Sequence, residues 1–429
     1  MTLIAWVTVA IFAGVYILVA TERIHRVAAA LGGAAIVLGL GIVSSEEAFY
    51  SAETGIDWDV IFLLLGMMLV VGVIRRTGVF EYMAIRSAKL AKGRPYRVMV
   101  LLVIVTAVAS ALLDNVTTIL LIAPVTLLLC DRLGLKPIPF LLALVLASNI
   151  GGTATLVGDP PNIIIASRAG LTFTDFLVHL APVVLVILLA YLVLIRLLFR
   201  GALQSDPGRA AALMSLDEKE AITDRKLLVR SGIVLAAILT GFLLQAQTGV
   251  APSVVALVGA GIMILLSPLK PRDLLSDVEW ETLLFFIGLF ILVGALVHVG
   301  ALELLAEWIA GVTNGAVAPT LMVVLVGSAF VSAIVDNIPY VTAMTPVVES
   351  LIASNPALGN EGGLWWALAL GADLGGNATL VGASANVVVV GIAARNSLHI
   401  SFVTWMKYGV PTAALSIAIS IPYVLLRYA

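Results

Sequence analysis

The sequence predicts an all-α polytopic membrane protein made of two inverted-topology repeats. Its 429 residues are 61% hydrophobic and only 12% charged, with a mean hydropathy of +1.12, whereas a soluble protein carries about 25% charged residues. Apolar runs of roughly 20 residues, enough to cross a bilayer as a helix, recur along the whole chain. An internal repeat and an uneven distribution of Lys and Arg supply the rest of the prediction.

One long unit occurs twice in the chain. The stretch "WDVIFLLLG" from Trp58 aligns with "WETLLFFIG" from Trp280, and Asp114-Asn115 aligns with Asp336-Asn337 at the same offset. Further on, "GGTATLVGDPPN" aligns with "GGNATLVGASAN" after a shift of two positions. Matching blocks in one order along most of the chain indicate an internal duplication.

The basic residues give the two units opposite orientations. Residues 75–97 carry seven Lys and Arg, while the matching residues 297–319 carry none. The reverse holds for residues 44–57, which carry none, and 267–279, which carry Lys270 and Arg272. Because Lys and Arg favour the cytoplasmic side, the two halves are predicted to be inverted in the cell inner (cytoplasmic) membrane. Inverted repeats are typical of secondary transporters.

Taken in order, the elements predict about ten transmembrane helices, two re-entrant hairpins and two broken helices. The N-terminus lies outside. Residues 1–200 form the first repeat, with a hairpin at 98–130 that enters from the cytoplasm and a broken helix at 138–165. Residues 201–230 form a cytoplasmic linker, and residues 231–429 form the second repeat, with a hairpin at 320–352 that enters from outside and a broken helix at 364–394.

The stretch 98–130 has two interpretations. It starts and ends among basic residues, so it is either a re-entrant hairpin or two complete spans. The hairpin is favoured because Asp114 and Asn115 divide it into arms of about 16 residues, short of the ~20 that a span needs.

The Asp-Asn pairs at the hairpin tips are the first predicted binding positions. Acids at membrane depth usually mark an ion path, a proton relay or a substrate site, which nominates Asp114, Asn115 and Thr117 in the first hairpin and Asp336 and Asn337 in the second. The alternative is that the aspartates cap the following helices, and the two roles are compatible.

The two loops that interrupt the broken helices are the second predicted binding positions. Their glycines and prolines break regular helices, and broken helices at membrane depth occur where they line a cavity or lie inside the protein. The nominated residues are Gly151, Gly152, Thr153, Thr155 and Asn162 in the first loop and Gly375, Gly376, Asn377, Thr379 and Asn386 in the second.

Each half adds one carboxylate that its partner lacks. Asp159 aligns with Ala383, and Asp373 aligns with Asn149. Because burial and an approaching cation shift a carboxyl group's proton affinity in opposite directions, the proton-coupling candidates are Asp114, Asp159, Asp336 and Asp373. For Asp159, a turn residue before two prolines is the alternative.

Several functional classes find no support. The single cysteine, Cys130, excludes a site built from several thiolates. The chain has no GxxxxGK[ST] motif for ATP hydrolysis and no HExxH or GxSxG motif of a membrane protease or esterase. The four histidines lack metal-ligand spacing. No cofactor, metal, catalytic residue or nucleic-acid partner is expected, only the lipid bilayer and a transported solute.

The motifs "LLDNVTTILLIAPVT", "NIGGTATLVGDPPNIII", "VDNIPYVTAMTPV" and "LGGNATLVGASANVV" resemble the ArsB/NhaD permease group of the ion transporter superfamily, especially its P-protein branch. The resemblance implies a scaffold part and a transport part with two opposed hairpins and two broken helices. Members resembling this pattern include arsenite efflux permeases, sodium/proton antiporters and anion permeases. The Ser-Asn-Thr tips of the superfamily's dicarboxylate carriers are missing from this sequence, which disfavours that substrate.

The leading hypothesis is proton-coupled efflux of arsenite or antimonite by alternating access. A sodium/proton antiporter or another anion permease is the nearest alternative, and a channel is less favoured because a pore does not need two inverted sites. The resemblance also allows a cytosolic ATPase subunit as a partner.

Overall fold

A computed structural model describes residues 2–21, 23–200 and 218–429, and within these ranges every regular element is a helix. Eight of the described helices are long and apolar enough to cross a membrane. The prediction of an all-α polytopic membrane protein is therefore confirmed.

The first repeat contains both long apolar helices and short connecting ones. Its helices are α1 (Leu3–Ala20), α2 (Arg26–Gly39), α3 (Ser45–Tyr50), α4 (Trp58–Arg75), α5 (Val79–Leu90), α6 (Pro95–Leu112), α7 (Asn115–Leu133), α8 (Pro137–Gly152), α9 (Pro160–Ala169), α10 (Phe173–His179) and α11 (Ala181–Leu198).

The second repeat follows the same order after a short 3-10 turn, η2 (Glu218–Ala221). Its helices are α13 (Arg225–Leu243), α14 (Gln245–Thr248), α15 (Pro252–Leu266), α16 (Pro271–Leu275), α17 (Trp280–His298), α18 (Ala301–Thr313), α19 (Val317–Ser332), α20 (Asn337–Ser354), η3 (Pro356–Gly362), α21 (Gly363–Gly375), η4 (Gly376–Ala378), α22 (Ser384–Arg395) and α23 (Phe402–Tyr428).

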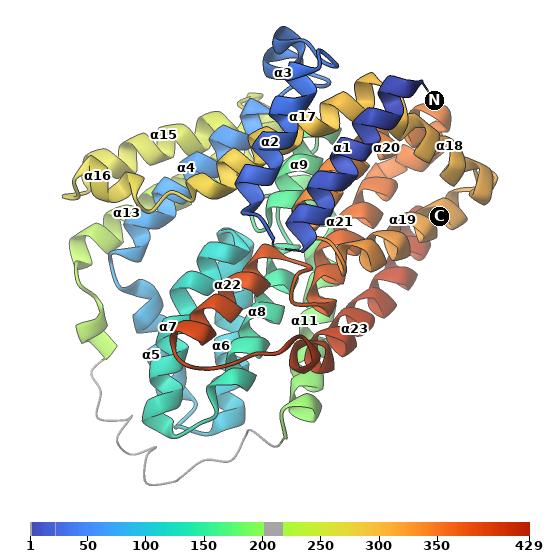
Figure 1. Cartoon of the computed structure of the whole chain (residues 1–429). Coiled ribbons are helices and arrows are strands. Elements are labelled where there is room, and N and C mark those ends of the chain that lie inside the picture. Colours follow the sequence, from blue (N-terminus) through green and yellow to red (C-terminus); the bar gives the residue numbers. More distant parts are fainter. Residues whose placement is uncertain (1, 22, 201–217) are drawn as a thin grey trace.

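The two hairpin-like pairs lie in different parts of the molecule. Figure 1 shows α6 and α7 together in the lower part and α19 and α20 together at the upper right. The chain reverses direction at Leu113-Asp114 in the first pair and between Ala333 and Asp336 in the second. The arms are 18 and 19 residues in the first pair and 16 and 18 in the second, so three of the four exceed the ~16 expected from the sequence.

Each broken helix contacts both hairpin pairs. The broken helix of the first repeat consists of α8 and α9, and that of the second consists of α21 and α22. The first halves pack within their own repeat, since α8 contacts α6 and α7, and α21 contacts α19. The second halves cross over, since α9 contacts α20, and α22 contacts α7. The two repeats are therefore interlocked at the hairpins rather than placed side by side.

The remaining long helices also pair across the repeats. Helix α4 packs against α15, and α17 packs against α2. Gly66 on α4 and Gly288 on α17 are counterparts, and a Cβ at either would lie 2.8 or 2.7 Å from backbone of Ala256 or Ala30. Glycine at both positions lets these helix pairs approach closely, as small residues do in membrane helix packing.

The region between the repeats is only partly described. Residues 201–217 of the predicted linker lie outside the described residues. Helix α13 starts at Arg225, ahead of the predicted boundary at residue 231. Its start is set by Asp224, whose side chain accepts hydrogen bonds from the backbone N–H groups of Lys226 and Leu227, both at 2.9 Å.

Candidate functional site

The tips of both hairpins converge on Asp159, which lies in the loop that breaks the first repeat's helix. Its Oδ2 accepts a hydrogen bond from Asn115 Nδ2 at 2.7 Å, and its Oδ1 accepts a longer one from Asn337 Nδ2 at 3.4 Å. All three side chains are buried. One carboxylate thus joins the N-terminal ends of α7 and α20, where helix dipoles favour negative charge.

Asn149, in the last turn of α8, extends this network to the second loop. Its Nδ2 donates to Asn377 Oδ1 at 2.9 Å and to Asn386 Oδ1 at 3.0 Å, and its Oδ1 accepts from Asn115 at 3.2 Å. Asn149 is fully buried. The amide therefore links hairpin tip, first loop and second loop in one chain of hydrogen bonds.

Each loop is braced by its own asparagine. Asn162 Nδ2 donates to Thr155 O at 3.0 Å, and Asn386 Nδ2 donates to Gly376 O and Thr379 O, both at 2.9 Å. These bonds satisfy carbonyl groups that the broken helices leave free, as membrane depth requires. The hydroxyls of Thr155 and Thr379 donate to carbonyls of the hairpin arms, those of Ala111 and Ala333.

The predicted glycines allow close backbone contacts within these loops. A Cβ on Gly152 would lie 2.5 Å from Gly158 O, and one on Gly376 would lie 2.5 Å from Gly382 O. Gly151 and Gly375 lie equally close to the hairpin arms, at the backbones of Ala107 and Ala329. These positions hold the loops in shape and give no side chain to a ligand.

The aspartates of the hairpin tips act as helix caps. Asp114 Oδ1 accepts from the backbone N–H of Thr117 at 2.8 Å at the start of α7, and Asp336 Oδ1 accepts from that of Ile338 at 3.1 Å at the start of α20. The capping alternative thus describes both residues. Thr117 takes part through its backbone, at the edge of the central network.

A cavity of about 840 Å³ is lined by Val335 and Asp336 at the second hairpin tip and by Val116 and Leu120 at the start of α7, next to the first tip. At its inner end, Asp336 Oδ2 accepts from Ser384 Oγ at 2.6 Å, and Ser384 Oγ accepts from Arg26 Nη1 at 3.1 Å. Arg26 Nη2 also donates to Thr282 Oγ1 at 3.3 Å. The ionisable residues that line the cavity are His25, Arg26, Glu279, Glu281, Asp336 and Arg395. These are residues of the predicted cytoplasmic ends and of one hairpin tip.

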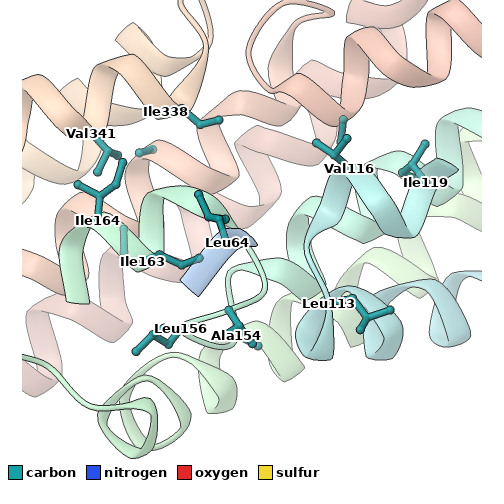
Figure 2. Close-up of a cluster of buried hydrophobic side chains, with 14 of the residues drawn as sticks. Leu64, Leu113, Val116, Ile119, Ala154, Leu156, Ile163, Ile164, Ile338 and Val341 are labelled. Carbon is teal, nitrogen blue, oxygen red and sulfur yellow. The ribbon is translucent and has the colours of Figure 1, made fainter. Parts of the chain in front are cut away.

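Apolar side chains enclose the polar centre. Figure 2 shows Ile338 and Val341 of α20 near Ile164 of α9, with Val116 and Ile119 on α7 and Leu113 at the hairpin turn. All six are buried. Water-poor surroundings strengthen every charge interaction at the centre and make an unpaired charge costly.

The structure brings together most of the nominated residues. Asn115, Asp159, Asn337, Asn377 and Asn386 share one network, and Asn162, Thr155 and Thr379 brace the loops around it. Asp373 and Thr153 lie beside each other, apart from that chain of bonds.

Three participants were not nominated. Asn149 was visible only as the repeat counterpart of Asp373, and an amide within an apolar helix was the signal that could have found it. Arg26 and Ser384 meet across 358 positions of sequence, which no local pattern reveals. Among the described residues no group of three or more His, Cys, Asp and Glu is placed to hold a metal.

Comparison with known proteins identifies the family of this chain. Residues 16–371 match the model of the family described as citrate transporter, CitMHS. The chain belongs to the CitMHS family. It is 54% identical over 422 residues to an uncharacterized transporter of Mycobacterium tuberculosis (strain ATCC 25618 / H37Rv) and equally to a 46 kDa membrane protein of Mycobacterium leprae, covering 98% of all these chains.

More distant relatives agree with the family. The chain is 32% identical over 505 residues to the P protein of Homo sapiens, covering 98% of this chain and 60% of P protein. Its fold is similar to the crystal structure of the Alcanivorax borkumensis YdaH transporter, with a TM-score of 0.59 and 14% identity over 85% of this chain and 83% of that one. The CitMHS protein is thus a membrane transporter related to P protein, while the ArsB/NhaD grouping stays a prediction.

Proposed function

We propose that this chain is a proton-coupled secondary transporter that exports arsenite or antimonite across the cytoplasmic membrane by alternating access. The observation that carries the proposal is the buried Asp159 carboxylate, which accepts from Asn115 of one hairpin tip and Asn337 of the other. A proton on Asp159 would remove acceptor capacity from one of these bonds, because a protonated carboxyl is partly a donor. Proton binding would thereby loosen the contact between the two tips.

The charges around the cavity argue against a polyanionic cargo. Three carboxylates, on Glu279, Glu281 and Asp336, face two arginines, Arg26 and Arg395. The name of the family suggests citrate, but a trianion would require an excess of positive charge at its site. Neutral As(OH)₃ instead presents hydroxyl groups, which amides, hydroxyls and backbone groups can bind. With one cysteine in the chain, an arsenic site here would be built from oxygen and nitrogen.

A sodium/proton antiporter is the second candidate. The buried carboxylate of Asp373 supports it, since a buried carboxylate is stabilised by a cation. A further partner, a cytosolic ATPase subunit, would dock on the cytoplasmic linker. That partner is proposed only on the resemblance to arsenite permeases.

The test is arsenite uptake into everted membrane vesicles with an imposed pH gradient. We expect uptake that saturates, needs the gradient and is abolished by a protonophore. Arsenite flux that is independent of the pH gradient, or the absence of arsenite flux, would contradict the proposal. Fluorescence dequenching of a pH dye on adding sodium but not arsenite would favour the antiporter, and unitary currents in planar bilayers would indicate a channel.

A further inference from the structure

The two loops contain a matched pair of sites, of which only one has an amide NH₂ group at its centre. In the first of these sites, the amide nitrogen of Asn149 lies between two oxygens, Asn377 Oδ1 and Asn386 Oδ1, at 2.9 and 3.0 Å. Asn149 belongs to the first repeat and both acceptors to the second. The NH₂ group carries partial positive charge into a space lined by oxygen atoms.

The repeat maps this arrangement onto a second set of residues. The counterparts of Asn149, Asn377 and Asn386 are Asp373, Thr153 and Asn162. The side chains of Thr153 and Asn162 are indeed the uncharged neighbours of Asp373. In this second site, however, a carboxylate has replaced the amide, so the group that supplied the donor is missing.

The polar atoms of the second site show the consequence. Among the residues that the structure describes, the side chains of Thr153 and Asn162 lie close to the Asp373 carboxylate, but no donor meets hydrogen-bond geometry at either of its oxygens, and Asn162 Oδ1 also has no partner. Asp373 and Asn162 are both fully buried. Buried polar groups are nearly always satisfied, so three unsatisfied acceptors in adjacent residues call for a positively charged or donating species between them.

Two helix ends reinforce the demand for positive charge. Asp373 lies in the last turn of α21, and Thr153 is the residue that ends α8. The C-terminal ends of both helices carry partial negative charge. Thr153 donates its own hydroxyl to Asn149 O at 2.9 Å, which leaves the hydroxyl oxygen free to act as a ligand.

We propose that Asp373, Asn162 and Thr153 form a binding site for one sodium ion, and that the Asn149 amide occupies the equivalent position in the other half. This inference goes beyond proton-coupled arsenite export and rests on the second candidate, the sodium/proton antiporter, because it supplies a bound cation at the transport centre. Hard monovalent cations take oxygen ligands, and broken-helix C-termini coordinate Na⁺ in other inverted-repeat transporters. The chain would bind a single sodium ion, because the amide of Asn149 fills the equivalent position in the other half.

The test is direct binding of ²²Na⁺ to the purified full-length chain in lipid nanodiscs, with choline replacing sodium. It needs no cargo, so it is independent of whether arsenite is transported. We expect saturable binding of one ion per chain for the wild type. Asp373→Asn should lose binding at least tenfold, since its NH₂ would fill the site as Asn149 does, while its thermal midpoint is retained or raised.

Two further variants make the outcome decisive. Glu307→Gln removes an exposed acid of α18 and should leave binding unchanged. Asn149→Asp should create a second site and raise the stoichiometry toward two. Absence of saturable ²²Na⁺ binding by the wild type, or undiminished binding by a folded Asp373→Asn protein, would overturn the proposal.

Discussion

The tips of the two hairpins have the same Asp-Asn sequence but different surroundings. At the first tip, the side chain of Leu113 is 3% exposed, and Val116 but not Asp114 lines the cavity. At the second tip, Val335 and Asp336 both line it, and Asp336 is joined through Ser384 to Arg26. Equivalent positions therefore differ in their contact with the cavity: Val335 and Asp336 line it, whereas their counterparts Leu113 and Asp114 do not.

This difference is what alternating access requires of an inverted repeat. If the repeats exchanged environments, Leu113 and Asp114 would come to line a cavity and Val335 and Asp336 would leave it. Asp159 contacts both tips, so its hydrogen bonds would respond to either movement. The cavity borders residues of the predicted cytoplasmic ends, which makes the present arrangement the inward-open one under that prediction.

The largest expected effect comes from adding a methyl group at a loop glycine that lies against a carbonyl of the same loop. Gly152→Ala and Gly376→Ala would each place a Cβ 2.5 Å from a carbonyl oxygen. Overpacking of this kind costs about 3 kcal/mol where backbone cannot yield, so we expect a large loss of folded protein and of transport. Thermal unfolding in detergent would measure it.

The control is Gly232→Ala on α13, where no described atom lies within 4 Å of the added Cβ. Because alanine favours helices over glycine by about 0.5–1 kcal/mol, this variant should be as stable as the wild type or slightly more so. Equal stability of all three variants would contradict the loop geometry.

Thiol labelling tests the difference between the cavity-lining Val335 and its buried counterpart Leu113 directly. Cys130 is buried, so single cysteines can be introduced with little background. We expect Val335→Cys to react with a hydrophilic maleimide at least about 30-fold faster than its counterpart Leu113→Cys, since even ~2 kcal/mol of local opening slows reaction by that factor. Labelling is followed in everted vesicles.

The reverse ratio would show that Leu113, rather than Val335, is the accessible position. Equal rates, with both thiols reactive, would mean that the two environments interchange faster than the reagent reacts. Either result would replace the comparison drawn from this conformation.

A smaller effect is expected at the link between the second tip and the helices around it. Arg26 donates to Ser384 at 3.1 Å and Thr282 at 3.3 Å, and it lies over the Phe285 ring at 5.6 Å from the centroid. The single ammonium group of a lysine cannot make both hydrogen bonds in the geometry of the planar guanidinium group. Arg26→Lys should lower vesicle transport about tenfold, equivalent to ~1.4 kcal/mol.

Arg23→Lys, in the same connection between α1 and α2, is the matched control and should transport normally. Normal transport by Arg26→Lys would show that transport does not need the hydrogen bonds of the guanidinium group at the second tip.

Much of this centre is predictable from the sequence because the repeat is encoded in it. Aligning the halves identifies both hairpin turns, both glycine loops and the unmatched Asp159 and Asp373 without any structure. Local capping rules also describe Asp114 and Asp336. These features depend on residues that are close in sequence or related by the duplication.

The remaining features depend on how the repeats interlock. That Asn149 reaches the opposite repeat's loop, and that Arg26 reaches Ser384, follows from the packing of α8 and α22 and of the α1–α2 connection. No periodicity or motif specifies those contacts. The sequence likewise does not reveal a cavity, so the difference in which tip residues line it comes from tertiary structure alone.

The smallest expected effect concerns the ion pairs between α5 and Glu218, for which the matching helix α18 has no basic residue. Glu218 accepts hydrogen bonds from Lys89 and, at 2.8 Å, from Arg86, both on α5. The matching helix α18 contains no Lys or Arg. The hydrogen bond from Lys89, aided by Arg86, lowers the pKa of Glu218 from 4.5 to about 2.

The sign of the pH effect follows from that lowered pKa. A carboxyl group with a lower pKa in the folded protein stabilises it fully above its unfolded pKa, and the contribution is lost as pH falls toward the folded value. We therefore expect the difference in thermal midpoint between the wild type and Glu218→Gln to be small and constant from about pH 7 to 5, and to shrink between about pH 4.5 and 3. Glu303→Gln on α18 should show no such dependence, and a difference that widens as pH falls would show that Glu218 is not paired with α5.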